Sequence, residues 1–392
     1  MQTRRTVRCV VLAVAALVAA AAGTGAAGAA PATPTSATAQ GTPARYVVTL
    51  KGGTSDVRAA AATQLGKVSP GERPQRVFSA VRSYTATLTA SEASALAADP
   101  AVLAVEADSV YTTQATQTNA PWGLDRIDQR YRPLSTTYTY NATGTGVRAY
   151  VIDTGIRFSH SDFGGRAISG YDAVDGGSAD DCNGHGTHVA STLGGSTYGV
   201  AKNVTLVGVR VLNCSGSGSL SGVVAGIDWA VANHAAGTPA VANLSLGGGP
   251  STAIDAAINR LHNDGVTVVV AAGNNGTNAC NGSPSRVPNA FTVAASNRYD
   301  AMPYWSNRGG CVDIIAPGVS VTAAWHTSTT ATRTISGTSM ASPHAAGAAA
   351  KLLQGSPGAS PTTIMNSLRS SATTGVVTGL GSTPNRLLYT TS

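Results

Sequence analysis

A run of apolar residues, VTVVVAA, occupies positions 266–272. In a strand, these side chains would point alternately to the two faces of a sheet, so both faces would have to be covered. Sheets that are buried on both sides are mainly parallel, and their strands read as nearly continuous apolar runs. Parallel strands are joined by crossover connections, which are usually helices. The run therefore predicts an α/β domain with a mainly parallel sheet.

Strand-like and helix-like segments alternate through the rest of this region. Further strands are expected at 146–152, 204–212, 241–246, 291–295 and 312–315. Helices are expected at 185–194, 221–234, 251–262 and 338–353. Sites in such folds form beyond the carboxyl ends of the strands, so functional residues are expected in the loops that follow them.

An earlier segment has a different order of elements. Strands are expected at 45–51, twice within 75–89 and at 101–110, with helices at 55–65 and 91–98. The order β-α-β-β-α-β predicts a small two-layer α+β domain. Ser91 is the expected N-cap of the second helix. Its capping box would be incomplete, because Ser94 rather than Glu or Gln stands three residues further on.

A polar stretch, YTTQATQTN at 111–119, follows this segment and is expected to lack regular structure. Composition changes across it, because the glutamates Glu72, Glu92 and Glu106 all precede it. We therefore expect a domain boundary here, with the first domain at 45–114 and the second at 115–392.

The N-terminus has the pattern of a secretory signal. Arg4, Arg5 and Arg8 precede an apolar run, Val10–Ala22, and small residues follow. We assign 1–30 to the signal, with an undefined cleavage point, and 31–44 to a linker rich in Pro, Thr and Ala. A membrane anchor is the alternative, but the run is short for a span of about 20 residues. A twin-arginine export signal, which would use Arg4-Arg5, is a further alternative. The chain is expected to be secreted, without a stable membrane anchor.

The charge distribution argues against nucleic-acid binding, and the cysteine content agrees with export. The net charge of +7 includes the three signal arginines, and no basic run with interleaved aromatic residues predicts nucleic-acid binding. Cys9 lies in the signal, which leaves Cys182, Cys214, Cys280 and Cys311, an even number suited to an oxidising compartment. Their spacing does not fit structural zinc. Three pairings remain open, of which the pairing of neighbours closes the shortest loops.

Three residues with complementary chemistry lie where this fold places sites. Asp153 follows an apolar strand, whereas His185 and Ser339 each stand at the start of an expected helix. A serine hydroxyl needs a base to become nucleophilic, and histidine acts as that base near neutral pH. A carboxylate can orient the imidazole and stabilise its cation. Taken alone, each has a structural alternative: a turn, a structural histidine and a helix cap.

Four motifs in order resemble those of the subtilisin-like serine proteases: VIDTG at 151–155, NGHGTHVA at 183–190, AAGN at 271–274 and GTSMASPH at 337–344. The order Asp, His, Ser is that of the subtilisins. The similarity covers about 115–390. Finer matches resemble the proteinase K group, and most closely its aqualysin-type members: PWGLDRIDQ at 121–129, YGVAK at 198–202 and PNRLLY at 384–389. The resemblance implies a three-layer catalytic domain.

By position, the resemblance implies a role for each site residue. Asp153 would orient, His185 would act as general base and acid, and Ser339 would attack the substrate carbonyl. Asn274, which could otherwise be a turn residue, would donate to the oxyanion. His188 receives no catalytic role and is interpreted as structural. Substrate would contact Gly216, Gly218, Ser245, Leu246, Gly247, Ala272 and Gly273. Because these segments carry no charge, we expect an apolar or aromatic side chain before the scissile bond.

The resemblance also implies calcium, disulfides and a zymogen. One calcium site would use Asp313 with the carbonyls of Pro288 and Ala290. A second would use Asp125, Asp128, Gln129, Ser135 and Thr137. Ordinary solvated carboxylates are the alternative at both sites. The implied disulfides are Cys182–Cys214 and Cys280–Cys311. The domain at 45–114 would be a ferredoxin-like inhibitory propeptide, cleaved near Gln114–Ala115 to release an active monomer.

Other functions fit less well. A zinc protease is disfavoured because HGTH at 185–188 lacks the Glu and the histidine spacing of an HExxH helix. The lack of any Glu after Glu106 also disfavours serine-carboxyl peptidases, which use Glu at the position of His185. A domain that only binds peptides is disfavoured by the complete set of motifs, and an intracellular processing protease by the signal and the cysteines.

Overall fold

The computed structural model describes residues 43–53, 55–108 and 115–390. The predicted signal peptide, nearly all of the linker and residues 109–114 lie outside the described ranges. The chain divides near residue 111 into two compact units, which are described separately. Within the described ranges, we find no helix with the length and apolar character needed to cross a membrane.

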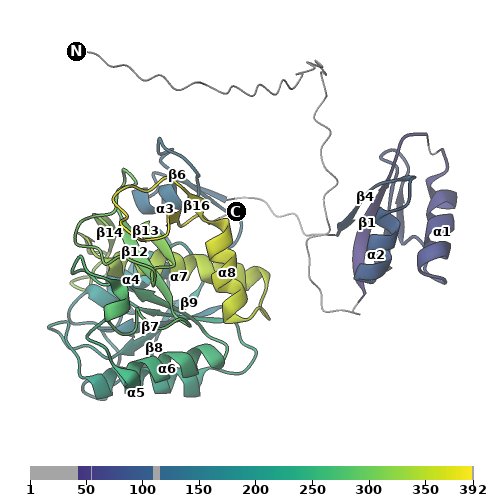
Figure 1. Cartoon of the computed structure of the whole chain (residues 1–392). Helices are drawn as coiled ribbons and strands as arrows, with labels where there is room; N and C mark the ends of the chain where they lie inside the picture. Colours follow the sequence, from purple (N-terminus) through teal and green to yellow (C-terminus); the bar gives the residue numbers. More distant parts are fainter. Residues whose placement is uncertain (1–42, 54, 109–114, 391–392) are drawn as a thin grey trace, which may run out of the picture. The chain divides into compact units, whose positions relative to one another are not determined.

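The first unit is a four-stranded antiparallel sheet with two helices (Figure 1). Its elements are β1 (Ala44–Leu50), α1 (Val57–Val68), β2 (Arg76–Phe78), β3 (Ser83–Leu88), α2 (Ala90–Ala97) and β4 (Val102–Ala107). The strands are ordered β2-β3-β1-β4. Val48 and Tyr84 of the sheet share a core with Leu65 and Leu96 of the helices. The β-α-β-β-α-β order is the one the sequence predicts.

The start of α2 differs from the sequence prediction. Its N-cap is Thr89, not Ser91, because the Thr89 hydroxyl accepts a hydrogen bond from the Glu92 N–H. The Glu92 carboxylate in turn accepts one from the Thr89 N–H at 2.7 Å. The capping box is therefore complete, and it satisfies two backbone donors that the helix itself leaves unpaired.

The second unit is built on a nine-stranded sheet ordered β16-β17-β13-β12-β11-β10-β7-β9-β8. All neighbouring pairs except β16 and β17 are parallel. The strands are β7 (Arg148–Asp153), β8 (Ala167–Asp172), β9 (Thr205–Arg210), β10 (Ala240–Leu244), β11 (Thr267–Ala271), β12 (Phe291–Ser296), β13 (Ile314–Pro317), β16 (Thr373–Thr374) and β17 (Arg386–Leu387).

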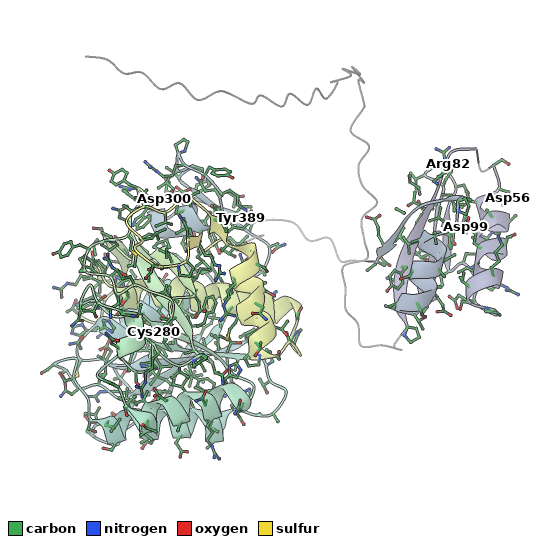
Figure 2. All side chains as sticks on the ribbon, in the orientation of Figure 1. Asp56, Arg82, Asp99, Cys280, Asp300 and Tyr389 are labelled. Carbon is green, nitrogen blue, oxygen red and sulfur yellow. A yellow bond between two sulfur atoms is a disulfide. The ribbon has the colours of Figure 1, made fainter. Side chains whose placement is uncertain are left out.

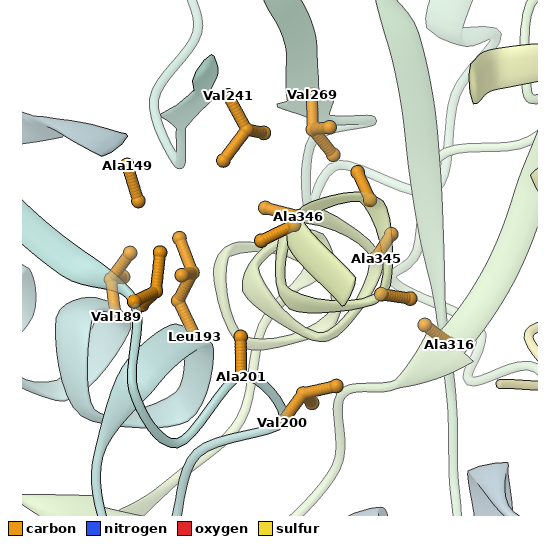
Figure 3. Packing of buried hydrophobic residues seen from close by; sticks show 14 of the residues in the cluster. Ala149, Val189, Leu193, Val200, Ala201, Val241, Val269, Ala316, Ala345 and Ala346 are labelled. Carbon is orange, nitrogen blue, oxygen red and sulfur yellow. The ribbon is translucent and has the colours of Figure 1, made fainter. Parts of the chain in front are cut away.

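Helices cover both faces of this sheet. Val269 of β11 belongs to the core shared with α4 (His185–Gly194), α7 (Thr338–Gly355) and α8 (Pro361–Ser371). Val268 and Val270 belong to the core shared with α5 (Leu220–Asn233) and α6 (Thr252–Asn263). Figure 3 shows the first core, with Val241 and Val269 of the sheet near Ala346 of α7. The apolar run at 266–272 is thus buried from both sides, and the predicted three-layer α/β fold is confirmed.

Alanine and glycine let α7 approach its neighbours closely. Ala345, Ala346, Ala348 and Ala349 are all buried in the first core. A Cβ atom on Gly347 would lie 2.6 Å from the Cβ atom of Val200, so no larger residue fits there without displacement. This close packing fixes the helix whose first turn carries Ser339.

Several elements were not predicted from the sequence. They include β8, β16 and β17 of the main sheet, β5 (Ala115–Thr118), α3 (Trp122–Ile127), β6 (Thr137–Tyr140), the hairpin of β14 (Val321–Ala324) and β15 (Thr332–Ile335), and the helix α8. The stretch at 111–119 was expected to lack regular structure, but its described part contains β5, which pairs with β6. Threonine suits such a polar strand, and Thr116 lies opposite Thr139.

Candidate active site

Asp153 is the last residue of β7, a central strand, and it is fully buried. Its Oδ1 atom lies 2.7 Å from Nδ1 of His185 and also accepts the N–H of Thr154 at 2.7 Å. Among the described residues, its Oδ2 atom has no hydrogen-bond partner. The buried side-chain carboxylate of Asp153 therefore lies at the C-terminal end of a parallel strand, in contact with His185.

His185 is the first residue of α4, and a glycine on each side allows its position. Gly184 has φ +106°, and a Cβ atom there would lie 2.4 Å from the Trp325 ring. A Cβ atom on Gly186 would lie 2.2 Å from the carbonyl oxygen of Gly155. Burial lowers the pKa of His185, but the Asp153 carboxylate and, to a smaller extent, Asp181 together outweigh burial, so the pKa lies above its usual value. The pair therefore favours the imidazolium, the state that a general base forms during reaction.

Ser339 lies in the first turn of α7, after Gly337 and Thr338. Its hydroxyl donates to the carbonyl oxygen of Ser245 at 3.1 Å, and the Ser245 hydroxyl donates back to the Ser339 carbonyl at 2.8 Å. In the absence of substrate, catalytic hydrogen bonds are often not yet formed. The helix N-terminus presents backbone N–H groups beside this hydroxyl, which favours negative charge there.

Asn274 follows β11 and is oriented by Thr338, the neighbour of Ser339. Its Oδ1 atom accepts hydrogen bonds from the N–H and from the hydroxyl of Thr338, both at 2.9 Å. The Thr338 hydroxyl also accepts the N–H of Gly273 at 3.0 Å. Since the side-chain oxygen is engaged, the Asn274 amide group is left to donate to another acceptor.

Two adjoining cavities surround these residues. A cavity of 520 Å³ is lined by Ser339, Asn274 and both segments predicted to form the primary pocket, 245–248 and 271–273. A cavity of 790 Å³ is lined by His185, the segment 215–220 and again 245–249. The two cavities share the segment 245–249, and together they are lined by all the predicted substrate residues. None of the described residues lining the first cavity is charged.

Asp181, which was not predicted as a site residue, is a buried residue that links the end of β7 to the start of α4. Its Oδ1 atom accepts the hydroxyl of Thr154 at 2.9 Å and the N–H groups of Asn183 and Gly184 at 2.9 and 2.8 Å. Its Oδ2 atom accepts the N–H and hydroxyl of Thr187, in the first turn of α4, at 2.9 and 2.6 Å. One carboxylate thus fixes the distance between the segments that carry Asp153 and His185. An acidic residue four positions before the histidine was the only local signal.

His188, which the sequence suggests is structural, lies away from the reaction groups. Its Nε2 atom is 3.1 Å from the carbonyl oxygens of Val321 and Arg333, one on each strand of the β14–β15 hairpin. Burial lowers its pKa to about 4, so it is neutral at physiological pH. It therefore ties α4 to this hairpin.

The four cysteines outside the signal form two disulfides. Cys182 pairs with Cys214. Cys280, which is labelled in Figure 2, pairs with Cys311. The first joins the loop before His185 to the loop before Gly216, so it connects two walls of the second cavity. These are the neighbour pairings that the resemblance implies.

The two predicted calcium sites differ in how well they fit a cation. Within the described ranges, no group of three or more His, Cys, Asp or Glu could by itself hold a metal ion. At the second site, the Oδ1 atom of Asp128 is buried without a hydrogen-bond partner among the described residues. The pKa of Asp128 is raised to about 6, mainly by burial and to a smaller extent by the nearby Asp125. A buried orphan oxygen beside a second carboxylate suits a hard cation.

The first predicted site does not fit. Asp313 accepts the N–H of Thr292 on Oδ2 at 2.7 Å, and its Oδ1 atom accepts two hydrogen bonds from Arg369. A guanidinium thus stands against the carboxylate that was expected, with the carbonyls of Pro288 and Ala290, to hold calcium. The buried negative charge at this site therefore already has a cation beside it.

Comparison with known proteins agrees with this architecture. The subtilase family model matches residues 144–386, and the peptidase inhibitor I9 model matches residues 45–114. The chain is 55% identical over 323 residues to an extracellular serine proteinase of Thermus sp. (strain Rt41A), covering 82% of this chain and 78% of that protein. It is 51% identical over 316 residues to alkaline serine exoprotease A of Vibrio alginolyticus, covering 79% and 58%.

A solved structure gives the same result. The crystal structure of a cold adapted subtilisin-like serine proteinase is 52% identical, with a TM-score of 0.68, and the match covers 70% of this chain and 100% of that chain. The resemblance stated from the motifs is confirmed, as is the presence of an inhibitor-type domain before the catalytic one. The chain therefore belongs to the subtilase family and is a serine endopeptidase with an N-terminal domain of the peptidase inhibitor I9 family.

Proposed function

We propose that this chain is a secreted endopeptidase of broad specificity, made as a zymogen that processes itself, with Asp153, His185 and Ser339 as its catalytic triad. The observation that carries the proposal is the 2.7 Å contact between His185 Nδ1 and the buried Asp153 carboxylate. His185 lines one of two cavities that share the segment 245–249, and Ser339 lines the other. The N-terminal sequence pattern and a relative named as extracellular support secretion.

The reaction begins at the Ser339 hydroxyl. Its oxygen attacks the scissile carbonyl carbon while His185 Nε2 takes the hydroxyl proton. Asp153 accepts the Nδ1–H of His185, which fixes the tautomer and stabilises the imidazolium. The carbonyl oxygen becomes an oxyanion, and the Asn274 side-chain amide and the Ser339 backbone N–H donate to it.

The tetrahedral intermediate that carries this oxyanion then collapses to the acyl-enzyme. The C–N bond breaks, and His185 gives its proton to the leaving amine. Water then enters, loses a proton to His185 and attacks the ester carbonyl. The C–O bond to Ser339 breaks, and the proton returns to the serine, which restores the enzyme.

Specificity follows from the lining of the two cavities. The uncharged cavity between 245–248 and 271–273 suits an apolar or aromatic side chain before the scissile bond. Gly216 and Gly218 line the neighbouring cavity, where exposed backbone can pair with an extended peptide as an added strand. A peptide library with every residue type at that position tests this, and a strict preference for Arg or Lys would contradict it.

The domain at 45–114 is proposed to act as an intramolecular inhibitor until cleavage near Gln114–Ala115. The match of the inhibitor I9 model to the same range supports this, and the mature enzyme would be a monomer of 115–392. N-terminal sequencing of the secreted protein is the test. A mature N-terminus far from Ala115 would rule out this processing site.

Calcium is proposed at the second site only, held by Asp125 and Asp128 with Gln129, Ser135 and Thr137. When bound, calcium would neutralise two carboxylates and brace the loop between α3 and β6. The orphan oxygen of Asp128 supports the assignment. The catalytic steps above do not involve this ion.

The assignment of the nucleophile has its own test. Phenylmethylsulfonyl fluoride should stop hydrolysis of casein and leave a sulfonyl group on Ser339, which peptide mass mapping can locate. A modified enzyme that carries the label on another residue would contradict the assignment.

A further inference from the structure

Asp313 is a carboxylate that needs a positive charge close by. It directly precedes β13, and its side chain is only 18% exposed. Its N–H donates to the Thr292 carbonyl at 2.9 Å, and its Oδ2 atom accepts the Thr292 N–H. Burial raises its pKa above the usual value, and the Thr292 hydrogen bond and nearby guanidinium groups offset only part of this rise. A carboxylate in this position stays ionised at low cost only with a cation against it.

Arg369 supplies that cation from the last turn of α8. Its Nε and Nη2 atoms donate to Oδ1 of Asp313 at 3.0 and 2.8 Å. Its Nη1 atom donates to Oδ1 of Asn366 at 2.8 Å, and the guanidinium lies 5.4 Å from the centre of the Phe291 ring. Contacts on three sides thus hold the guanidinium at the carboxylate.

A divalent cation could not share this place. The guanidinium is charged at every physiological pH, and like charges about 4 Å apart repel by several kcal/mol at the dielectric of a protein surface. Two of the three hydrogen bonds that the Asp313 oxygens accept come from the guanidinium of Arg369, so the carboxylate that calcium would need is already paired with a cation.

We propose that Arg369 takes the place of calcium at Asp313, so that this chain binds no metal through Asp313, Pro288 and Ala290. An ion that would otherwise come from solution is replaced by a side chain of the protein. The link between α8 and the residues at the start of β12 and β13 is therefore independent of calcium.

Counting bound calcium tests this without using catalysis. Wild type, Asp313→Asn and Arg369→Leu are inhibited with phenylmethylsulfonyl fluoride, freed of metal and dialysed against about 1 mM calcium, a concentration that fills extracellular sites. Asp313→Asn should bind as many ions as wild type. Arg369→Leu should bind one more, and the double variant should lose this gain. Arg260→Leu, which removes an arginine from the last turn of α6, is the matched control and should bind as wild type does.

Thermal unfolding gives a second readout. Arg369→Leu should melt several degrees lower than wild type without calcium and should regain part of this loss when calcium is added, beyond the gain of wild type. A loss of one ion in Asp313→Asn would overturn the proposal, and so would an Arg369→Leu protein that binds no additional ion. If Arg369→Leu does not fold, the isosteric Asp313→Asn carries the test alone. Calcium counts remain readable even in a chain without peptidase activity.

Discussion

The imidazole Nδ1 atom of His185 lies 2.7 Å from Oδ1 of Asp153, and the two side chains differ sharply in exposure. Asp153 is fully buried, whereas 26% of the His185 side chain is exposed. The pair therefore connects an anion fixed in the sheet edge to a base that lines one of the two cavities.

The pH dependence of activity should report His185. Its pKa lies above the usual 6.5, because Asp153, with a smaller contribution from Asp181, outweighs the effect of burial. Only neutral imidazole accepts a proton, so kcat/KM should fall as pH drops through a midpoint above 6.5. Asp153→Asn should move this midpoint to lower pH and reduce kcat by about 10⁴-fold. A profile in which the substitution leaves the midpoint unchanged would contradict the pairing.

Asp181 should act as a positioning residue for His185. Asp181→Asn removes charge and acceptors at the turn before α4, and kcat should fall by about 10- to 100-fold with little change in KM, because small displacements of a base are costly. The acid midpoint of kcat/KM should also drop, since Asp181 adds to the charge that raises the pKa of His185.

The control for Asp181 is Asp162→Asn. Asp162 is also buried and accepts a hydrogen bond from α4, through the Ser191 hydroxyl at 2.7 Å, but it lies near the far end of the helix. That variant should lose thermal stability while keeping kcat and the midpoint. If kcat and the acid midpoint were the same in the two variants, Asp181 would have a purely structural role.

Removing the Asn274 side chain should affect the transition state more than substrate binding. Asn274→Ala should lower kcat by about 100- to 1000-fold at nearly constant KM, the size known for an oxyanion-hole donor in a subtilisin. Thr338→Val should cause a smaller loss, since it frees the Asn274 oxygen from one of its two donors. Peptide anilide kinetics would measure both, and a rise in KM alone would argue against an oxyanion role.

Calcium should stabilise the protein in a pH-dependent way through Asp128. Burial, aided by Asp125, raises the pKa of Asp128 from 3.8 to about 6 in the folded state. Without calcium, stability from this group is therefore lost as pH rises from about 4 to above 6. Calcium binds the ionised form, so its effect on the melting temperature should be larger at pH 8 than at pH 5. Asp128→Asn should abolish this difference, and an equal effect at both pH values would contradict the site.

Much of the fold could be read from local sequence. The helix at 185–194 has the predicted bounds, and the strand within 266–272 is buried on both faces, because apolar periodicity and glycines mark such elements. The start of α8 was also readable, since Ser360 caps it and Pro361 occupies its first turn. The capping box of α2 was also readable, because Glu92 stands three residues after Thr89. The expected N-cap, Ser91, lies two residues after the true one.

The missed features depend on contacts between distant positions. Arg369 meets Asp313 across 56 positions, and Asp181 reaches Thr154 across 27. The β14–β15 hairpin is polar and mostly exposed on β15, so it lacks the apolar alternation that predicts a strand. Such pairings are set by tertiary packing, and a single sequence gives little sign of them.

The central claim is that Ser339 is the nucleophile, and removing its hydroxyl tests this most directly. Wild type, Ser339→Ala and Ser342→Ala would be expressed as full chains and assayed on casein; Ser342 lies in the same helix, and its hydroxyl bonds to Asn243 instead. Ser339→Ala should lose activity by about 10⁶-fold, as removal of the nucleophile does in a subtilisin, and should stay unprocessed, while Ser342→Ala remains active. Activity of Ser339→Ala equal to that of wild type would contradict the account.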